Sequence, residues 1–176
     1  MAPAPSVSFV ETQFRALQPA LRRFLYAMVR DRALADDLLQ DTFLEACRTP
    51  DRLMAAGDPA AWLFQVARRR ALNAHRSAGR FRGAVERFAG RREQQEQTDD
   101  YREPADAAAA LTLLDGLDGP ERALVLLRYV HGFEAQELAE ITERSPAAVR
   151  KQLERLRGRL ADRLGTEEAE QDGVPA

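Results

Sequence analysis

Apolar residues recur at helical spacing along most of the chain, and no stretch alternates between apolar and polar residues as a strand does. The first such block predicts a helix over about residues 9–29, and the second predicts one over about 33–48. A further helix is predicted from Pro59, because the fixed φ of proline suits a first helical turn. The intervening segment 49–59, "TPDRLMAAGDP", has the proline, glycine and aspartate content of a loop. The pattern therefore predicts an all-α fold.

The second half of the chain returns to the helical pattern after an interruption. From Gly90 to about Ala108 the residues are mostly Gln, Glu, Asp and Arg with few large apolar side chains, which is typical of a linker. A helix is then predicted over "LDGPERALVLLRYVHGF", with Asp118 or Gly119 before Pro120 as its start. We expect two small helical domains joined by a flexible linker. The predicted parts are an N-terminal domain over 1–90, a linker over 91–110, a C-terminal domain over 111–165 and a disordered acidic tail over 166–176.

The helix predicted over 33–48 has two distinct faces at about 100° per residue. Its apolar face consists of Ala35, Leu38, Leu39, Thr42, Phe43 and Ala46. Its polar face consists of Asp36, Asp37, Gln40, Asp41, Glu45 and Arg48. Leu44 lies in the middle of the polar face. Such acidity is not expected of a surface that faces DNA phosphates, and an exposed leucine within it is unusual.

Residues 135–153 have the spacing of a helix-turn-helix motif. The pattern predicts a short helix over Ala135–Ile141, a turn over Thr142–Ser145 and a second helix from Pro146. The apolar stripe of the second helix consists of Val149, Leu153, Leu156, Leu160 and Leu164. The opposite face carries Ala147, Arg150, Lys151 and Glu154. That face either enters the major groove of DNA, where basic side chains reach guanine edges or phosphates, or is the solvated face of an amphipathic hairpin.

The segment 62–83, "WLFQVARRRALNAHRSAGRFRG", interleaves basic and aromatic residues. One face is predicted to carry Gln65, Arg68, Arg69, His75 and Arg76, flanked by Trp62 and Asn73. Arg80 and Arg82 follow, with Phe81 between them. This arrangement fits a surface that follows phosphates and stacks unpaired bases, whereas the alternative is that the arginines only solvate the helix.

Charge is segregated along the chain, although the formal net charge is only −2. Residues 1–92 carry 16 arginines against nine acidic residues, whereas 93–110 carry six acidic residues against one arginine. Basic surfaces on folded parts with acidic segments between and after them are therefore expected. The single cysteine and two histidines exclude internal disulfides and a cysteine-rich metal site. No transmembrane span, signal peptide or catalytic constellation is recognisable, so we expect a cytoplasmic protein that is not an enzyme and needs no cofactor.

Three segments in this order resemble the bacterial RNA polymerase sigma factors of the small extracytoplasmic-function class. "RDRALADDLLQDTFLEACR" is similar to the helix of the family's second region, and "DPAAWLFQVARRRALNAHRSAGR" resembles the adjoining helix that reads the minus-ten element. "LDGPERALVLLRYVHGFEAQELAEI" and "SPAAVRKQLERLRGRL" together resemble the fourth region, which reads the minus-thirty-five element. The resemblance covers about residues 9–89 and 111–164. It implies a second-region-like helical bundle followed by a fourth-region-like helix-turn-helix domain.

The resemblance also implies a role for particular residues. The face that docks the coiled coil of the largest polymerase subunit would consist of Asp37, Gln40, Asp41 and Leu44. The surface that meets the melted minus-ten element would include the 52–58 loop and Trp62, Arg68, Arg69, Asn73, Arg76 and Arg80. The surface that reads the minus-thirty-five duplex would consist of Ser145, Ala147, Arg150, Lys151 and Glu154.

The turn of the predicted helix-turn-helix departs from the family pattern. Glu143 and Arg144 stand where the family usually has glycine and a hydrophobic residue. If Glu143 adopts a positive φ, the conformation costs on the order of 1 kcal/mol; otherwise the turn has a different shape.

The resemblance implies promoter-directed transcription initiation, with core RNA polymerase, promoter DNA and an anti-sigma factor as partners and no insertion into a membrane. One alternative is a sigma-like decoy that binds an anti-sigma factor without initiating transcription. The arginine-rich helix argues against it, because a decoy needs no surface that reads bases. Another alternative is a plain helix-turn-helix regulator, for which the acidic helix would have no purpose.

Overall fold

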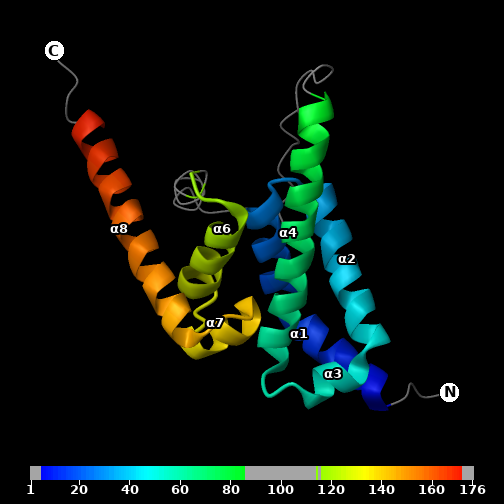
Figure 1. The fold of residues 1–176 in the computed structure, drawn as a ribbon. Helices are drawn as coiled ribbons and strands as arrows, with labels where there is room; N and C mark the ends of the chain where they lie inside the picture. The colour runs from blue at the N-terminus through cyan, green and yellow to red at the C-terminus, as the bar shows by residue number, and fades with distance from the viewer. Residues whose placement is uncertain (1–4, 86–113, 115, 172–176) are drawn as a thin grey trace. The chain divides into compact units, whose positions relative to one another are not determined.

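The computed structural model describes residues 5–85, 114 and 116–171, with side chains over 8–77, 114 and 116–164. Every regular element in these ranges is helical (Figure 1), and the chain divides into two compact units, Met1–Arg102 and Glu103–Ala176. The all-α fold predicted from the periodicity is thereby confirmed. The predicted linker over 91–110 lies outside the described residues.

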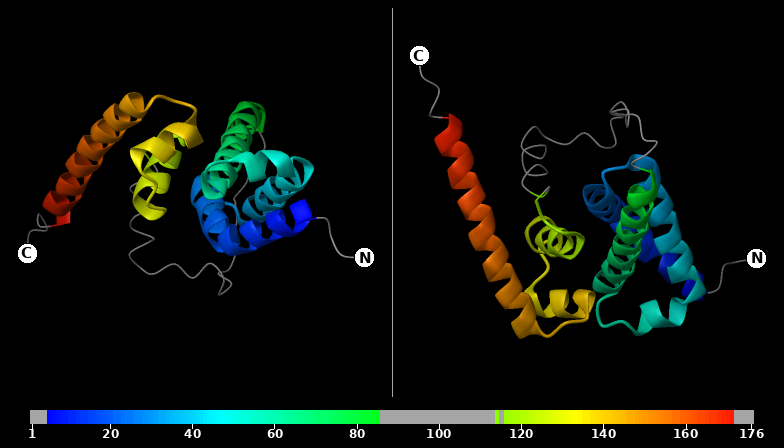
Figure 2. Two further views of the ribbon diagram at one scale, coloured as in Figure 1. Left: turned by 90° about the horizontal axis from the view of Figure 1, so that it is seen from below. Right: turned by 45° about the horizontal axis from the view of Figure 1, so that its top comes forward.

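The first unit contains four helices. They are α1 (Pro5–Val29), α2 (Arg32–Arg48), α3 (Pro50–Ala55) and α4 (Pro59–Val85). Helices α1, α2 and α4 pack against one another, and the short α3 contacts all three, as the two views of Figure 2 also show. The result is a small bundle in which each long helix contributes one apolar face to a shared core.

The core of this bundle is formed by the positions that the periodicity marks as apolar. The fully buried side chains of α1 include Leu21, Phe24, Leu25 and Met28. Phe24 meets Phe64 of α4 with ring centroids 5.5 Å apart and ring planes at 73°, an edge-to-face contact. Fully burying an apolar side chain of this size stabilises the fold by about 1.5–3 kcal/mol. This core fixes which faces of α2 and α4 are left for solvent.

The N-terminus of α2 is fixed by a side-chain cap. The Asp31 carboxylate accepts a hydrogen bond from the Leu34 N–H at 3.0 Å, which satisfies one of the free donors of the first turn. Within the helix, the buried Thr42 hydroxyl donates to the Leu38 carbonyl at 2.8 Å. The single polar residue on the apolar face of α2 is therefore paired, and the face packs as the pattern predicts.

The segment predicted as a loop contains helix α3, and that prediction was wrong for Pro50–Ala55. Pro50 occupies the first turn of this helix, where its lack of an N–H costs nothing. Leu53 is fully buried and anchors the helix to the bundle. A helix of six residues is too short to produce a recognisable periodic pattern, and its proline and aspartate are residue types that are also typical of loops.

The second unit begins with a capped helix and ends with a long one. Its elements are α6 (Gly119–Val125), the π-helical turn η2 (Leu126–Val130), α7 (Ala135–Thr142) and α8 (Pro146–Gln171). Asp118 caps α6: its carboxylate accepts from the Glu121 N–H at 2.8 Å, while the Glu121 carboxylate accepts from the Asp118 N–H. The start predicted from the Asp-Gly-Pro sequence is confirmed, whereas the π-helical turn was not anticipated.

The predicted helix-turn-helix is present as α7 and α8, which pack against each other. Leu138 and Ile141 of α7 are fully buried, as are Val149 and Leu156 of α8. Ala139 is buried as well, as expected for a small residue where two helices cross. The apolar stripe predicted along α8 ends earlier than expected, because Leu164 is 45% exposed.

The tail predicted as disordered from residue 166 is helical as far as Gln171. Glu, Ala and Gln have high helix propensity, so these residues extend α8 although their charge suggested disorder. Residues 172–176 lie outside the described residues. In the described part of the chain, no helix has both the length and the apolar content that crossing a membrane requires.

Candidate functional site

The outward face of α2 consists of an exposed leucine surrounded by polar side chains. Leu44 has an exposed fraction of 38%, and its helical neighbours Asp37, Gln40 and Asp41 are all exposed. The buried face on the opposite side of the helix holds this orientation. A leucine within an acidic rim is suited to contact an apolar side chain of a basic partner.

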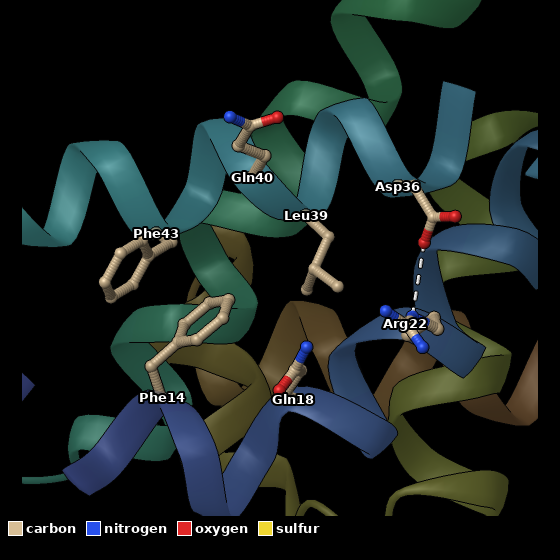
Figure 3. Close-up of a pocket in the computed structure, with 7 residues that line it drawn as sticks. All are labelled: Phe14, Gln18, Arg22, Asp36, Leu39, Gln40 and Phe43. Carbon is tan, nitrogen blue, oxygen red and sulfur yellow. Dashed lines mark ion pairs between the residues drawn. The ribbon is translucent and has the colours of Figure 1, made fainter. Parts of the chain in front are cut away.

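On the side toward α1, this face borders a shallow groove of about 200 Å³. The lining residues are Phe14, Gln18, Arg22, Asp36, Leu39, Gln40 and Phe43. In Figure 3, Leu39 points toward α1 while the amide of Gln40 is directed away from it. The rings of Phe14 and Phe43 lie 4.8 Å apart between their centroids, and Arg22 Nε pairs with Asp36 at 3.2 Å. The α1 flank of α2 is thus held by one aromatic contact and one ion pair.

On the side toward α4, the same helix carries an ion-pair cluster that we call the α2–α4 cluster: Asp41, Glu45, Arg69 and Arg70. One oxygen of the Glu45 carboxylate pairs with Arg69, and the other accepts from Arg70 at 2.7 Å. Arg70 also donates to Asp41 at 3.1 Å. Burial raises the pKa of Glu45, but the hydrogen bonds and charges of the two arginines outweigh burial and leave that pKa below its ordinary value. Glu45 is therefore held as a carboxylate between the two helices.

The exposed face of α4 brings together four of the residues predicted to meet the minus-ten element. Arg69, Asn73 and Arg76 are exposed, and Trp62 is half-buried. At about 100° per residue, all of them lie within roughly 40° of Trp62 around the helix axis. The structure therefore offers one aromatic and two basic side chains on a single strip of surface.

Two residues predicted to share this face lie elsewhere on α4. Arg68 and His75 are both half-buried and lie roughly 120–140° around the helix from Trp62. His75 Nε2 lies 2.6 Å from the carbonyl oxygen of Met28 in the last turn of α1, so this histidine joins two helices. The expectation of one face for all the polar residues was wrong, because Arg68 and His75 lie between the buried positions Ala61 and Phe64 around the helix. The Arg80 side chain lies outside the described residues.

The outward face of the helix-turn-helix carries all five residues predicted for it. Ser145, Ala147, Arg150, Lys151 and Glu154 are exposed. The Ser145 hydroxyl accepts from the Ala148 N–H at 3.2 Å and so caps α8. Glu143 ends α7 with a φ of 56°, so the turn has the strained left-handed form, the first of the two alternatives. This turn presents the first two turns of α8 to solvent, as a helix that enters a major groove requires.

Glu45 and Arg70 are the residues of this region that sequence reasoning missed. Glu45 was assigned only to the polar face of α2, and Arg70 was one arginine in a run of three. Periodicity gives each residue a direction on its own helix but does not identify the partner on another helix. No group of His, Cys, Asp and Glu suited to a metal ion occurs among the residues that the structure describes.

Comparison with known proteins assigns both units. The family model for sigma-70 region 2 matches residues 13–81, and that for sigma-70 region 4 matches residues 107–160. The chain is 32% identical over 163 residues to RNA polymerase sigma factor CarQ of Myxococcus xanthus, which covers 91% of each chain. It is 31% identical over 125 residues to ECF RNA polymerase sigma factor SigL of Mycobacterium tuberculosis, which covers 68% of each.

Among solved structures, the chain resembles the sigma factor RpoE of Bartonella quintana, crystallised with the anti-sigma factor NepR. The TM-score is 0.72, and the match covers 88% of this chain and 96% of that one. At 23% identity, this likeness concerns the fold.

Proposed function

The chain belongs to the extracytoplasmic-function class of RNA polymerase sigma factors, and from this premise we propose how its surfaces divide the work of initiation. As a member of this class it binds core RNA polymerase and directs transcription initiation at specific promoters. The first unit supplies the docking surface and the minus-ten surface. The second unit supplies the minus-thirty-five surface.

The observation that carries the docking proposal is the exposure of Leu44 within the acidic rim of α2. Asp37, Gln40, Asp41 and Leu44 form the surface that meets the coiled coil of the largest polymerase subunit. The leucine supplies apolar contact area, and the carboxylates attract basic side chains and set the register of docking. The acidity that is unsuited to DNA is suited to this protein partner.

The minus-ten surface is the exposed strip of α4 with the adjacent 52–58 segment. Trp62 offers a ring for stacking on an unpaired base, worth about 1–3 kcal/mol per base. Arg69, Asn73 and Arg76 offer hydrogen bonds and positive charge. Arg68, which lies apart from this strip, and Arg80, assigned by its place in the sequence, add further positive charge to the helix. Capture of unpaired bases stabilises the melted promoter, so the chain assists opening without forming or breaking a covalent bond.

The minus-thirty-five surface is the N-terminal part of α8. Arg150 and Lys151 reach guanine edges or phosphates of the duplex, and Glu154 accepts from cytosine. Ser145 and Ala147 have small side chains, so at these positions the backbone of α8 can approach the DNA closely. The exposure of all five side chains on one end of a capped helix supports this role.

The proposed division of the chain follows the sequence pattern. The docking and minus-ten surfaces belong to a domain over 1–90, and the minus-thirty-five surface belongs to a domain over 111–165. Residues 91–110 connect them. Because the chain works with RNA polymerase on promoter DNA, it acts in the cytoplasm.

An anti-sigma factor is the further partner that we propose. The support is the solved sigma factor of similar fold, whose crystals contain an anti-sigma factor. The decoy and the plain regulator are less well supported, because neither explains a docking face and a base-reading face on the same unit.

Leu44→Asp tests the docking surface. The change removes the apolar centre and adds a charge, so the dissociation constant for core polymerase is expected to rise about tenfold or more. Binding is measured by fluorescence anisotropy of the labelled chain, and helical content by circular dichroism. Leu164→Asp is the matched control, because Leu164 is similarly exposed but belongs to no proposed surface. Unchanged binding by Leu44→Asp would remove the docking assignment, and loss of helical content would show that Leu44 supports the fold.

A further inference from the structure

The two proposed surfaces of the first unit meet at one carboxylate. Glu45 belongs to α2, the helix of the docking face, and its oxygens pair with Arg69 and Arg70 of α4. The side chain of Glu45 is only 25% exposed, whereas that of Arg69 is 53% exposed. The carboxylate is thus at the base of the cluster and the Arg69 guanidinium is at its outer edge.

The four charges of the α2–α4 cluster balance. Asp41 and Glu45 carry one negative charge each, and Arg69 and Arg70 carry one positive charge each at neutral pH. Arg70 has both carboxylates as partners, whereas Arg69, within the described part of the chain, forms its ion pair with Glu45 alone. Removing the charge of Glu45 therefore leaves Arg70 paired with Asp41 and releases Arg69.

We infer that Glu45 is a positioning residue for promoter recognition, which holds the Arg69 guanidinium in place on the exposed strip of α4 and neutralises its charge. This inference rests on the proposed role of Arg69 at the melted minus-ten strand. A fixed guanidinium donates its hydrogen bonds in a defined direction, which favours a matching base. A released guanidinium is attracted to any phosphate, which favours every sequence alike.

The two residues therefore have different roles in promoter recognition. Arg69 contacts the DNA, and Glu45 acts through Arg69 without touching the strand. Ion pairs near the protein surface contribute little to stability, so Glu45→Gln is expected to leave the fold intact and to have its main effect on sequence discrimination.

Glu45→Gln tests the inference, because it removes the charge and keeps the shape. Holoenzyme is assembled from the full chain and core RNA polymerase. The probes are a single-stranded oligonucleotide that wild-type holoenzyme selects from a pool with a randomised minus-ten element, and a scrambled oligonucleotide of the same composition. We expect affinity for the scrambled strand to rise about twofold to fivefold, and discrimination to fall by the same factor. The slope of log affinity against log salt for that strand should steepen by about 0.7, for one more phosphate neutralised.

Asp36→Asn is the matched control. It makes the same change of charge on the same helix, but at a residue that pairs with Arg22 of α1. Discrimination and salt slope should stay at the wild-type values. Equal effects of Glu45→Gln and Asp36→Asn would overturn the inference, because they would reflect only the net charge of α2.

The double variant separates this inference from the proposed function. In an Arg69→Ala background, Glu45→Gln should have no further effect on discrimination, because its target is gone. A full effect there would show that Glu45 does not act through Arg69. If Arg69→Ala alone leaves discrimination unchanged, the assignment of Arg69 to the minus-ten surface fails. If Arg69→Ala lowers discrimination and Glu45→Gln does not, the inference alone fails.

Discussion

At the scale of single residues, α7 ends at a glutamate whose backbone adopts the left-handed conformation. Glu143 lies in the left-handed region with a φ of 56° and a ψ of 41°. Its N–H donates toward the Ala139 and Glu140 carbonyls, and the Arg144 N–H donates to the Ala139 carbonyl at 3.0 Å. These bonds close the last turn of α7, and the left-handed residue aims the chain toward α8.

Glu143→Gly is expected to stabilise the second unit. Glycine adopts positive φ without the steric cost of a Cβ, so the free energy of unfolding should rise by about 1 kcal/mol. The measurement is native-state hydrogen exchange of the α7 and α8 amides in the full chain, which reports the opening of this unit.

Glu140→Gly is the control for that prediction. Glu140 is an exposed residue of the same helix in helical conformation, where glycine costs roughly 0.5–1 kcal/mol. The two substitutions should therefore shift the opening free energy in opposite directions. A loss of stability in both variants would show that the Glu143 conformation is not strained.

Residue-level predictions succeeded where the cause lies within a few positions along the chain. The start of α8 at Pro146 and the start of α6 at Asp118 or Gly119 were both predicted, because the capping bonds that define these starts join residues three apart. The bond between His75 and Met28 and the pairs of Glu45 could not be predicted. These contacts join residues on different helices, and their partners depend on how the helices pack.

At the scale of helices, α2 is the element whose two faces were predicted best. Its apolar positions are buried except for the half-buried Phe43, and Leu44 stands exposed on the other face. A 17-residue helix passes through almost five turns, so its pattern is well defined. The shorter α3 and the π-helical turn η2 contain too few residues to impose such a pattern.

The contact between α2 and α4 should weaken in acid. The folded pKa of Glu45 lies below the ordinary value of 4.5, so its carboxylate contributes stability above that value. This contribution is lost as the pH falls from 4.5 through the lower folded pKa, where the carboxyl becomes protonated. Glu45→Gln should therefore be less stable than the wild type at pH 7, and the difference should vanish in acid.

Urea unfolding followed by Trp62 fluorescence at a series of pH values measures this difference. Trp62 is the only tryptophan of the chain, and it lies on α4, so its signal reports the first unit. A difference between the two proteins that does not change with pH would contradict the prediction. In that case the stabilising group would not be the ionised Glu45.

At the scale of the whole molecule, the sequence predicted the all-α fold class and the order of the two family regions along the chain. Helical periodicity predicts helices wherever it extends over several turns, and the segments of α2, α4 and α8 each resembled the same family. The sequence predicted less well which residues of α4 share its exposed strip. Arg68 lies apart from the exposed strip of α4, and Arg69 is paired with a helix that sequence reasoning treated separately.

The proposed partners explain why acidic and basic residues are separated along the chain. In the proposed function, the outward face of α2 is acidic because it meets a protein, and the exposed faces of α4 and α8 are basic because they meet DNA. One small chain thereby binds two partners of opposite character. Between α2 and α4, the α2–α4 cluster joins the two kinds of surface.

Run-off transcription is the most direct test of promoter-directed initiation by this chain. Core RNA polymerase, the purified full chain and linear templates with a randomised promoter region are combined, and the transcripts are sequenced. We expect transcripts that depend on both proteins and start downstream of shared minus-thirty-five and minus-ten sequences. Absence of such transcripts from every template, although the chain binds the polymerase, would contradict the account and favour the sigma-like decoy.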